Sequence, residues 1–167
     1  MEGDHTIKLL LKEDYIEAHP TVSPDGRWIA YGSTESGKQE PEIYVRPFPE
    51  VDKGKWQVST NGGNSPLWSP DGRELFYLTG MSTTEAAMRV KVQTESTFKN
   101  ERPEILFRGT YVGFYPGDFP WDIHPDGRRF LMIKPPQTEG SPEAASRPRI
   151  VIILNWLEEL KQRVPTK

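Results

Sequence analysis

Short apolar runs with the period of two that is typical of β-strands recur along the whole chain. The clearest is 28–33, Trp-Ile-Ala-Tyr-Gly-Ser, in which neighbouring side chains would point to opposite faces of a strand. Clusters of Pro, Gly, Asn and Asp separate the runs and mark turns. The pattern therefore predicts an all-β chain. The predicted strands are 6–11, 19–23, 28–33, 42–48, 56–60, 65–69, 74–78, 87–92, 104–107, 119–124, 129–133 and 149–154.

The tripeptide Pro-Asp-Gly occurs three times, at 24–26, 70–72 and 125–127, each time between two predicted strands and followed by Arg. In such a turn Pro presets φ, Asp caps the backbone and Gly accepts a positive φ, which explains the repeated Asp without any chemistry. A turn repeated in matching context indicates a repeat protein, and four short strands per unit are typical of a β-propeller blade. The three predicted blades span about 17–60, 64–108 and 118–154.

The number of strands predicts how the chain assembles. The third blade has only three predicted strands, whereas the lone strand 6–11 precedes the first blade. After residue 154, Asn155 and Glu158 form a capping-box pattern that predicts a short C-terminal helix at about 155–164. Three blades are fewer than the four to eight that close a ring, and an open arc would leave bare strand edges. We predict a homodimer in which two copies form a six-bladed ring and exchange strand 6–11 to complete each other's last blade. The alternative is a longer protein that carries the missing blades.

Several segments resemble the repeats of a known family. Residues 23–31, 42–49, 55–60 and 68–77 resemble TolB-type, WD-like propeller repeats. They are most similar to those at the C-terminal end of bacterial membrane-anchored serine/threonine kinases and related regulators, and 150–160 resembles the close of such proteins. The resemblance implies a propeller that senses or binds proteins while the chemistry resides elsewhere. No kinase motif is present in this sequence.

Composition and charge exclude several classes of partner. The chain has 21 Lys and Arg against 24 Asp and Glu, a net charge of -3, so it has neither a basic footprint for nucleic acid nor a polybasic patch for membranes. It has no Cys, which excludes disulfides and thiolate chemistry. The longest apolar run, 150–154, is too short to span a bilayer, and the first residues lack the features of a signal peptide. We expect the compartment to be the cytoplasm.

The segment 32–38, Gly-Ser-Thr-Glu-Ser-Gly-Lys, matches the spacing of a phosphate-binding loop. Gln39 stands where the magnesium-binding hydroxyl belongs, and Pro41 opposes the helix that should follow. We interpret the segment as a polar hairpin loop.

His19 is the main candidate for chemistry. It lies on a first strand, which lines the central channel of a propeller, with Glu17, Ser65 and Asp118 expected nearby. In a two-fold ring these groups would appear twice and could bind a divalent metal or an anion, as in some propeller lyases. No spacing matches an established metal motif, so a hydrogen-bonded channel side chain and no cofactor is the favoured interpretation. The alternative function is a metal-assisted lyase or hydrolase that works in the channel around His19.

Aromatic residues in the long connection before the third blade are the preferred binding region. Tyr111, Phe114, Tyr115 and Phe119 lie among Gly and Pro residues and resemble an adaptable loop over the channel mouth. Binding surfaces are enriched in such side chains. The sequence therefore favours a noncatalytic module that binds a protein, a peptide or a small ligand through these four residues, His19 and Asp118. Trp68 and Trp121 are expected to pack between neighbouring blades.

Overall fold

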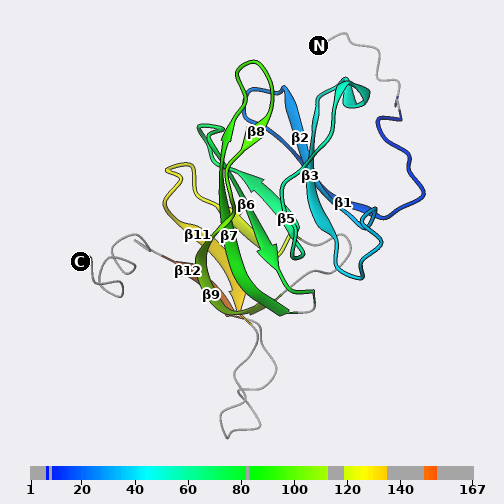
Figure 1. The fold of residues 1–167 in the computed structure, drawn as a ribbon. Helices are drawn as coiled ribbons and strands as arrows, with labels where there is room; N and C mark the ends of the chain where they lie inside the picture. Colours follow the sequence, from blue (N-terminus) through cyan, green and yellow to red (C-terminus); the bar gives the residue numbers. More distant parts are fainter. Residues whose placement is uncertain (1–6, 8, 82, 113–118, 135–148, 154–167) are drawn as a thin grey trace, which may run out of the picture.

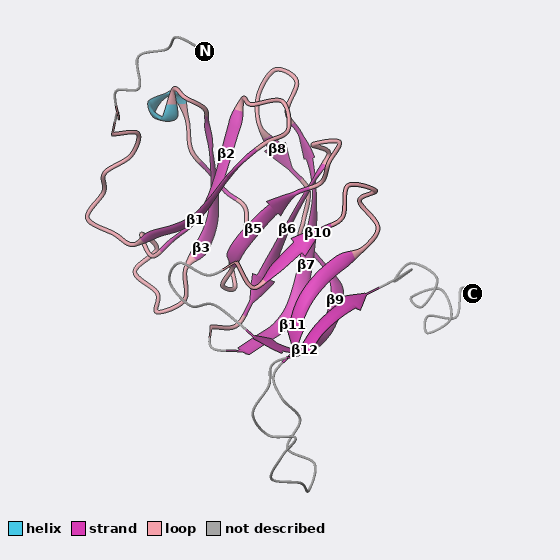
Figure 2. Cartoon of the chain, turned by 180° about the vertical axis from the view of Figure 1, so that it is seen from behind, coloured by secondary structure: helices cyan, strands magenta, loops and turns pink. Residues whose placement is uncertain are grey.

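The chain folds into antiparallel sheets that lie side by side in sequence order (Figures 1 and 2). The computed structural model describes residues 7, 9–81, 83–112, 119–134 and 149–153. Sheet 1 has the order β1-β2-β3-β4, sheet 3 has the order β10-β11-β12, and in sheet 2 the path β5-β6-β7-β8 is joined by β9, which pairs with β7. The predicted all-β class is confirmed.

The bounds follow the sequence pattern closely. The strands are β1 Glu17–Val22, β2 Trp28–Ser33, β3 Glu42–Pro47, β4 Trp56–Gln57, β5 Asn64–Trp68, β6 Glu74–Thr79, β7 Thr83–Gln93, β8 Lys99–Asn100, β9 Glu104–Val112, β10 Trp121–Ile123, β11 Phe130–Lys134 and β12 Arg149–Ile153, and a 3-10 turn, η1 Val51–Lys53, lies between β3 and β4. Among the described residues there is no helix both long and apolar enough to cross a membrane.

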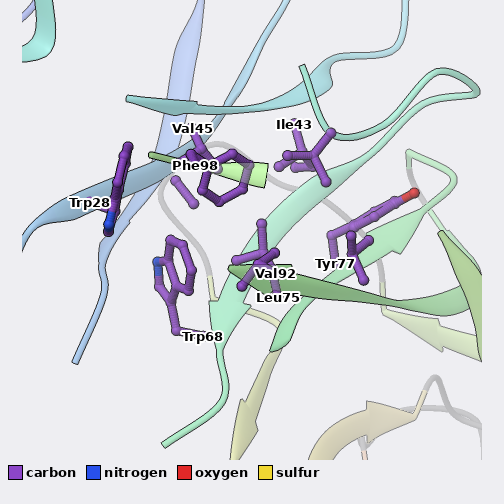
Figure 3. Close-up of a cluster of buried hydrophobic side chains, with 11 residues drawn as sticks. Trp28, Ile43, Val45, Trp68, Leu75, Tyr77, Val92 and Phe98 are labelled. Carbon is purple, nitrogen blue, oxygen red and sulfur yellow. The ribbon is translucent and has the colours of Figure 1, made fainter. Parts of the chain in front are cut away.

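The core between sheets 1 and 2 is aromatic (Figure 3). Trp28 from β2 and Trp68 from β5 enclose Phe98, which lies between β7 and β8 and is only 1% exposed. The ring centroids of Phe98 and Trp28 are 5.6 Å apart, and those of Phe98 and Trp68 are 6.4 Å apart. Phe98 therefore anchors the β7–β8 hairpin to both sheets.

A second core cluster joins sheets 2 and 3. Phe76 and Leu78 of β6 meet Phe130 and Met132 of β11, and all four side chains are buried. Phe76 and Phe130 contact edge to face, with ring centroids 5.1 Å apart. Because side chains alternate along β6, Leu75 and Tyr77 lie on its opposite face and belong to the first cluster. Sheet 2 is thus covered on both faces.

The Pro-Asp-Gly turns have the architectural role that the sequence predicts. In the first turn, the Ser23 hydroxyl donates to Asp25 Oδ1 at 2.6 Å and accepts from the Trp28 N–H at 3.0 Å. The second turn repeats this arrangement with Ser69 and Asp71, at 2.6 Å. All three turn glycines have φ close to +70°. The Asp side chains are therefore occupied in holding the turns closed.

Successive turns also touch one another. A Cβ at Gly72 would lie 3.7 Å from Cδ of Pro24, and a Cβ at Gly127 would lie 3.5 Å from Cδ of Pro70. The glycine of each turn thus packs against the proline of the turn before it, and the three turns form a row along one rim of the molecule.

The structure differs from the predicted strands in three places. The described residues of the predicted strand 6–11, namely 7 and 9–11, are not in a strand of the single chain, and their pairing with a second copy stays a prediction. In sheet 2, β9 extends to Val112 rather than ending near 107, because β7 begins at Thr83 and pairs with it along this length. The residues between the predicted strands 87–92 and 104–107 contain β8 and the buried Phe98. The predicted helix at 155–164 lies outside the described residues.

Candidate functional site

The first strands of the three sheets are neighbours. β5 contacts β1 on one side and β10 on the other, so these strands form the inner edge of the arc. Trp68 Nε1 donates to the Thr21 carbonyl at 3.2 Å, and Trp121 Nε1 donates to the Ser65 carbonyl at 2.8 Å. The two tryptophans therefore tie each inner strand to the one before it, as the sequence predicts.

Two inner strands carry the same backbone irregularity. The pairing register of β1 with β2 shifts between Ala18 and Thr21, and that of β5 with β6 shifts between Asn64 and Leu67. Within these bulges His19 has φ 52° and Ser65 has φ 50°. Left-handed backbone is uncommon outside glycine and costs about 1–2 kcal/mol per residue. A bulge re-aims side chains, and here it turns these two toward each other.

The inner strands bring a small polar and aromatic cluster together. Ser65 Oγ lies 3.2 Å from Nδ1 of His19, within hydrogen-bonding distance. The ring of Phe119, two residues before the start of β10, lies 5.2 Å from the His19 ring, centroid to centroid, at an interplanar angle of 57°. His19 is 4% exposed and Ser65 is 1% exposed, whereas Phe119 is 56% exposed. We call His19, Ser65 and Phe119 the inner-strand cluster.

The inner-strand cluster resembles a nucleophile and base only in its residue types. A catalytic Ser–His pair needs a hydroxyl that a substrate can reach, and the hydroxyl of Ser65 is buried. Among the described residues no group of three or more His, Asp or Glu side chains could hold a metal. What the cluster presents to solvent is the ring of Phe119. Its geometry therefore suits contact with a ligand.

The other predicted site residues lie elsewhere or outside the described part of the chain. Tyr111 is in β9, the outer strand of sheet 2, where it pairs with Thr84 and packs edge to face on Phe107, with ring centroids 6.0 Å apart. The expectation that Tyr111 belongs to a loop at the channel mouth is wrong, because the β7–β9 ladder includes it. Phe114, Tyr115 and Asp118 lie outside the described residues.

Glu17 is not beside the inner-strand cluster. It lines a cavity of about 190 Å³ beneath Leu10 and Leu11, on the outer face of sheet 1. Partial burial and then the charge of Glu13 raise the pKa of Glu17. The carboxylate that the sequence places near His19 thus faces the N-terminal segment instead.

The segment with phosphate-loop spacing is a structural loop between β2 and β3. Lys38 Nζ donates to Glu42 Oε1 and to the Thr60 carbonyl, both at 2.8 Å. Glu42 is completely buried and also accepts from Ser59 Oγ at 2.5 Å. The lysine that would contact a phosphate therefore neutralises a buried carboxylate.

Sequence reasoning missed one groove. It has a volume of about 940 Å³ and lies between the first two Pro-Asp-Gly turns and the β7–β8 hairpin. Both signs of charge line it, from Arg27, Arg73, Lys91 and Lys99 to Asp25, Asp71, Glu74, Glu95 and Glu101. No sequence signal marks it, because its charges come from separate segments and no sign dominates.

Comparison with known proteins identifies the fold class. No family model matches the chain. The chain is similar in structure to the TolB protein from Agrobacterium tumefaciens, with a TM-score of 0.50 and 17% identity over 85% of this chain and 50% of that one. It is similar in structure to oligogalacturonate lyase from Vibrio parahaemolyticus, with a TM-score of 0.52 and 16% identity over 74% of this chain and 31% of that one. The antiparallel sheets thus have the fold of TolB-like propeller proteins.

Two proteins are similar in sequence to part of the chain. The chain is 35% identical to the Tol-Pal system protein TolB of Alcanivorax borkumensis over 71 residues, which are 42% of this chain and 16% of that protein. It is 32% identical to dipeptidyl aminopeptidase BI of Pseudoxanthomonas mexicana over 88 residues, 52% of this chain and 12% of that protein. The match spans less than a fifth of either relative. The predicted resemblance to TolB is confirmed, and the narrower resemblance to kinase propellers stays a prediction.

Proposed function

We propose that this chain is a noncatalytic binding module, built as three propeller blades that form half of a two-fold, six-bladed ring. Its ligand would be a protein, a peptide or a small molecule held at one mouth of the channel that the inner strands line. The observation that carries the proposal is the inner-strand cluster, in which two bulged strands and Phe119 converge from three sheets.

Phe119 is exposed, and the backbone that supports it is strained. Phe119 keeps 56% of its surface exposed although an apolar ring gains free energy by burial. Behind it, strained residues are held in place by the surrounding sheets, and strain of this kind is concentrated at functional sites. An exposed aromatic ring on a rigid base is a favourable contact surface, because little conformational freedom is lost on binding.

The remaining predicted contacts complete the proposal. Phe114, Tyr115 and Asp118 precede Phe119 in the chain and are proposed to extend the same surface. The resemblance to propellers of bacterial serine/threonine kinases favours a sensing or protein-binding role, and we place the module in the cytoplasm. Neither nucleic acid nor a membrane is a proposed partner, because a chain with a net charge of -3 has no basic surface that would attract either of them.

A peptide array tests the proposed site. Wild-type protein and the Phe119→Ala variant are applied to the same array of peptides of varied sequence. Ile105→Ala is the matched control, because Ile105 is 47% exposed but lies on the outer strand β9. We expect Phe119→Ala to lose signals that Ile105→Ala retains, with both variants folded by circular dichroism. Equal binding by all three proteins would refute the inner-strand site.

The second candidate is a metal-assisted lyase or hydrolase, and the structural similarity to an oligogalacturonate lyase is the observation in its favour. It requires a divalent metal near His19, whereas Nδ1 of His19 already lies at hydrogen-bonding distance from Ser65. Metal analysis after incubation with manganese, calcium and zinc separates the two candidates. One metal bound per chain, together with cleavage of oligogalacturonate, would replace the binding module by the lyase.

A further inference from the structure

The two faces of each sheet can be assigned from the turn register. Counted from the turn glycine, position +3 is Ile29, Leu75 or Phe130, and position +5 is Tyr31, Tyr77 or Met132. Leu75 and Tyr77 pack in the cluster shared with sheet 1, and Phe130 and Met132 pack in the cluster shared with sheet 2. In both sheets these positions therefore face the preceding sheet.

Positions +4 and +6 face the following sheet. In sheet 2 they are Phe76 and Leu78, which pack against Phe130 and Met132 of sheet 3. In sheet 3 they are Leu131 and Ile133, on the opposite side of β11 from the second cluster. Leu131 is 41% exposed. Sheet 3 thus presents, outward, the positions that elsewhere in the chain are covered by another sheet.

A groove of about 450 Å³ runs from this outward face to the inner edge of the sheets. Leu131 and Ile133 line it on the outward face, and it is further lined by Leu67, Phe119, Pro120, Trp121 and Asp122. Exposed apolar grooves of this kind mark interaction sites. The groove adjoins the inner-strand cluster through Phe119.

We propose that the part of this groove formed by Leu131 and Ile133 docks sheet 1 of a second copy of the chain, in the register with which sheet 3 docks on sheet 2, and leaves Phe119 exposed at the channel mouth. The proposal rests on the proposed ring and names its contact. Phe76 at +4 meets Phe130 at +3, with ring centroids 5.1 Å apart. By the same register, Leu131 at +4 meets Ile29 of the second copy, and Tyr31 of the second copy follows two positions along. The known sheet 2–sheet 3 contact therefore supplies the template.

In the single chain, that face of sheet 1 is covered by the N-terminal segment, residues 9–13. Leu10 and Leu11 bound a cavity of about 190 Å³ together with Ile29 and Tyr31. Glu13 Oε1 accepts from Arg46 Nη2 at 2.8 Å, and Arg46 Nε donates to the Tyr31 hydroxyl at 2.7 Å.

The N-terminal segment thus occupies the place of the missing sheet and is exchanged for it on docking. One ion pair helps to hold it there, between Arg46, whose side chain is 8% exposed, and Glu13, whose side chain is 35% exposed. Moving residues 9–13 away from sheet 1 would also release the strand 6–11, which overlaps them, for the predicted exchange.

Sedimentation velocity tests the docking surface. We expect wild-type protein to sediment at about twice 19.1 kDa and Leu131→Asp to sediment at 19.1 kDa while its circular dichroism is unchanged. Ile105→Asp, which places the same charge on an exposed strand outside the groove, should remain a dimer. Wild-type monomers would overturn both this inference and the proposed ring, whereas a dimer that Leu131→Asp leaves intact would overturn only this surface. The peptide array reports separately on ligand binding.

Disulfide trapping tests the register, because the chain has no native Cys. A mixture of Leu131→Cys and Ile29→Cys copies should form a covalent dimer under oxidation, and neither variant alone should do so. Linking by Leu131→Cys alone would show a groove-to-groove dimer and overturn the register. For the N-terminal segment, Glu13→Gln should lower the dimer dissociation constant roughly two- to five-fold. An unchanged constant would overturn the exchange.

Discussion

Replacing the buried carboxylate of Glu42 should destabilise the protein more than replacing any exposed glutamate. Glu42 is 0% exposed and accepts hydrogen bonds from Lys38 Nζ at 2.8 Å, Ser59 Oγ at 2.5 Å and the Gly62 N–H at 3.2 Å. Ser59 in turn accepts from the Ile43 N–H at 2.8 Å. One carboxylate therefore joins β3 to the segment that follows β4.

The size of the effect follows from what is left behind. In Glu42→Ala, the Lys38 ammonium can return to water, because its side chain is 55% exposed. The Ser59 and Gly62 donors remain buried, and an unsatisfied buried donor costs about 1–3 kcal/mol. The two together cost about 2–6 kcal/mol in the free energy of unfolding. In Glu42→Gln the amide oxygen still accepts one bond, so the loss should be about half as large.

Urea unfolding at pH 7, followed by fluorescence and extrapolated to water, measures these losses. Glu101→Ala is the control, because Glu101 is exposed and should change stability by no more than about 0.5 kcal/mol. A loss below about 1 kcal/mol for Glu42→Ala would refute the reasoning, because it would mean that the two donors find other partners.

Three further predictions concern the core and two titrating groups. Phe98→Ala should lower the free energy of unfolding by about 3–5 kcal/mol in the same urea assay, because Phe98 fills the space between two sheets; a loss of under 1 kcal/mol would place it outside the core. The hydrogen bond from Ser69 holds the pKa of Asp71 below its ordinary 3.8, so the stability that Asp71 adds relative to Asp71→Asn is fully present above that pH and is lost as the pH falls toward the folded-state pKa; a difference that stays constant between pH 7 and pH 2 would contradict this. Burial, and then the charge of Glu35, raise the pKa of Tyr44 to about 12, so the free energy of unfolding should fall as the pH rises above 10. In an ultraviolet titration, Tyr44→Phe should lack one tyrosine that ionises near pH 12 in the wild-type protein. If the missing tyrosine is instead one that ionises near pH 10, the buried position of the Tyr44 ring is contradicted.

The sequence predicts much of the fold because its signals are local. Period-two alternation in β2 and β6 places one set of side chains on each face, and those faces become the two core clusters. The Pro-Asp-Gly turns require nothing beyond their own residues and one Ser or His before them. These elements could therefore be read without knowledge of the rest of the chain.

What the sequence does not predict depends on distant partners. Tyr111 is in a strand because β7 begins far enough back to pair with it, and no residue near Tyr111 carries that information. Phe98 lies between two predicted strands in the sequence, and only the structure shows that two tryptophans from different sheets enclose it. The bulges at His19 and Ser65 carry one local signal, since each residue precedes Pro in an inner strand. That signal marks an irregularity but not the contact that it creates.

The row of turns has a consequence for how such a chain can change in length. Gly72 packs against Pro24 and Gly127 packs against Pro70, so each of these two turns contacts the turn before it. A tandem copy of one unit carries its own proline for the next turn and its own glycine for the previous one. A duplication in the gene would therefore add a repeat with this turn contact already formed on both sides.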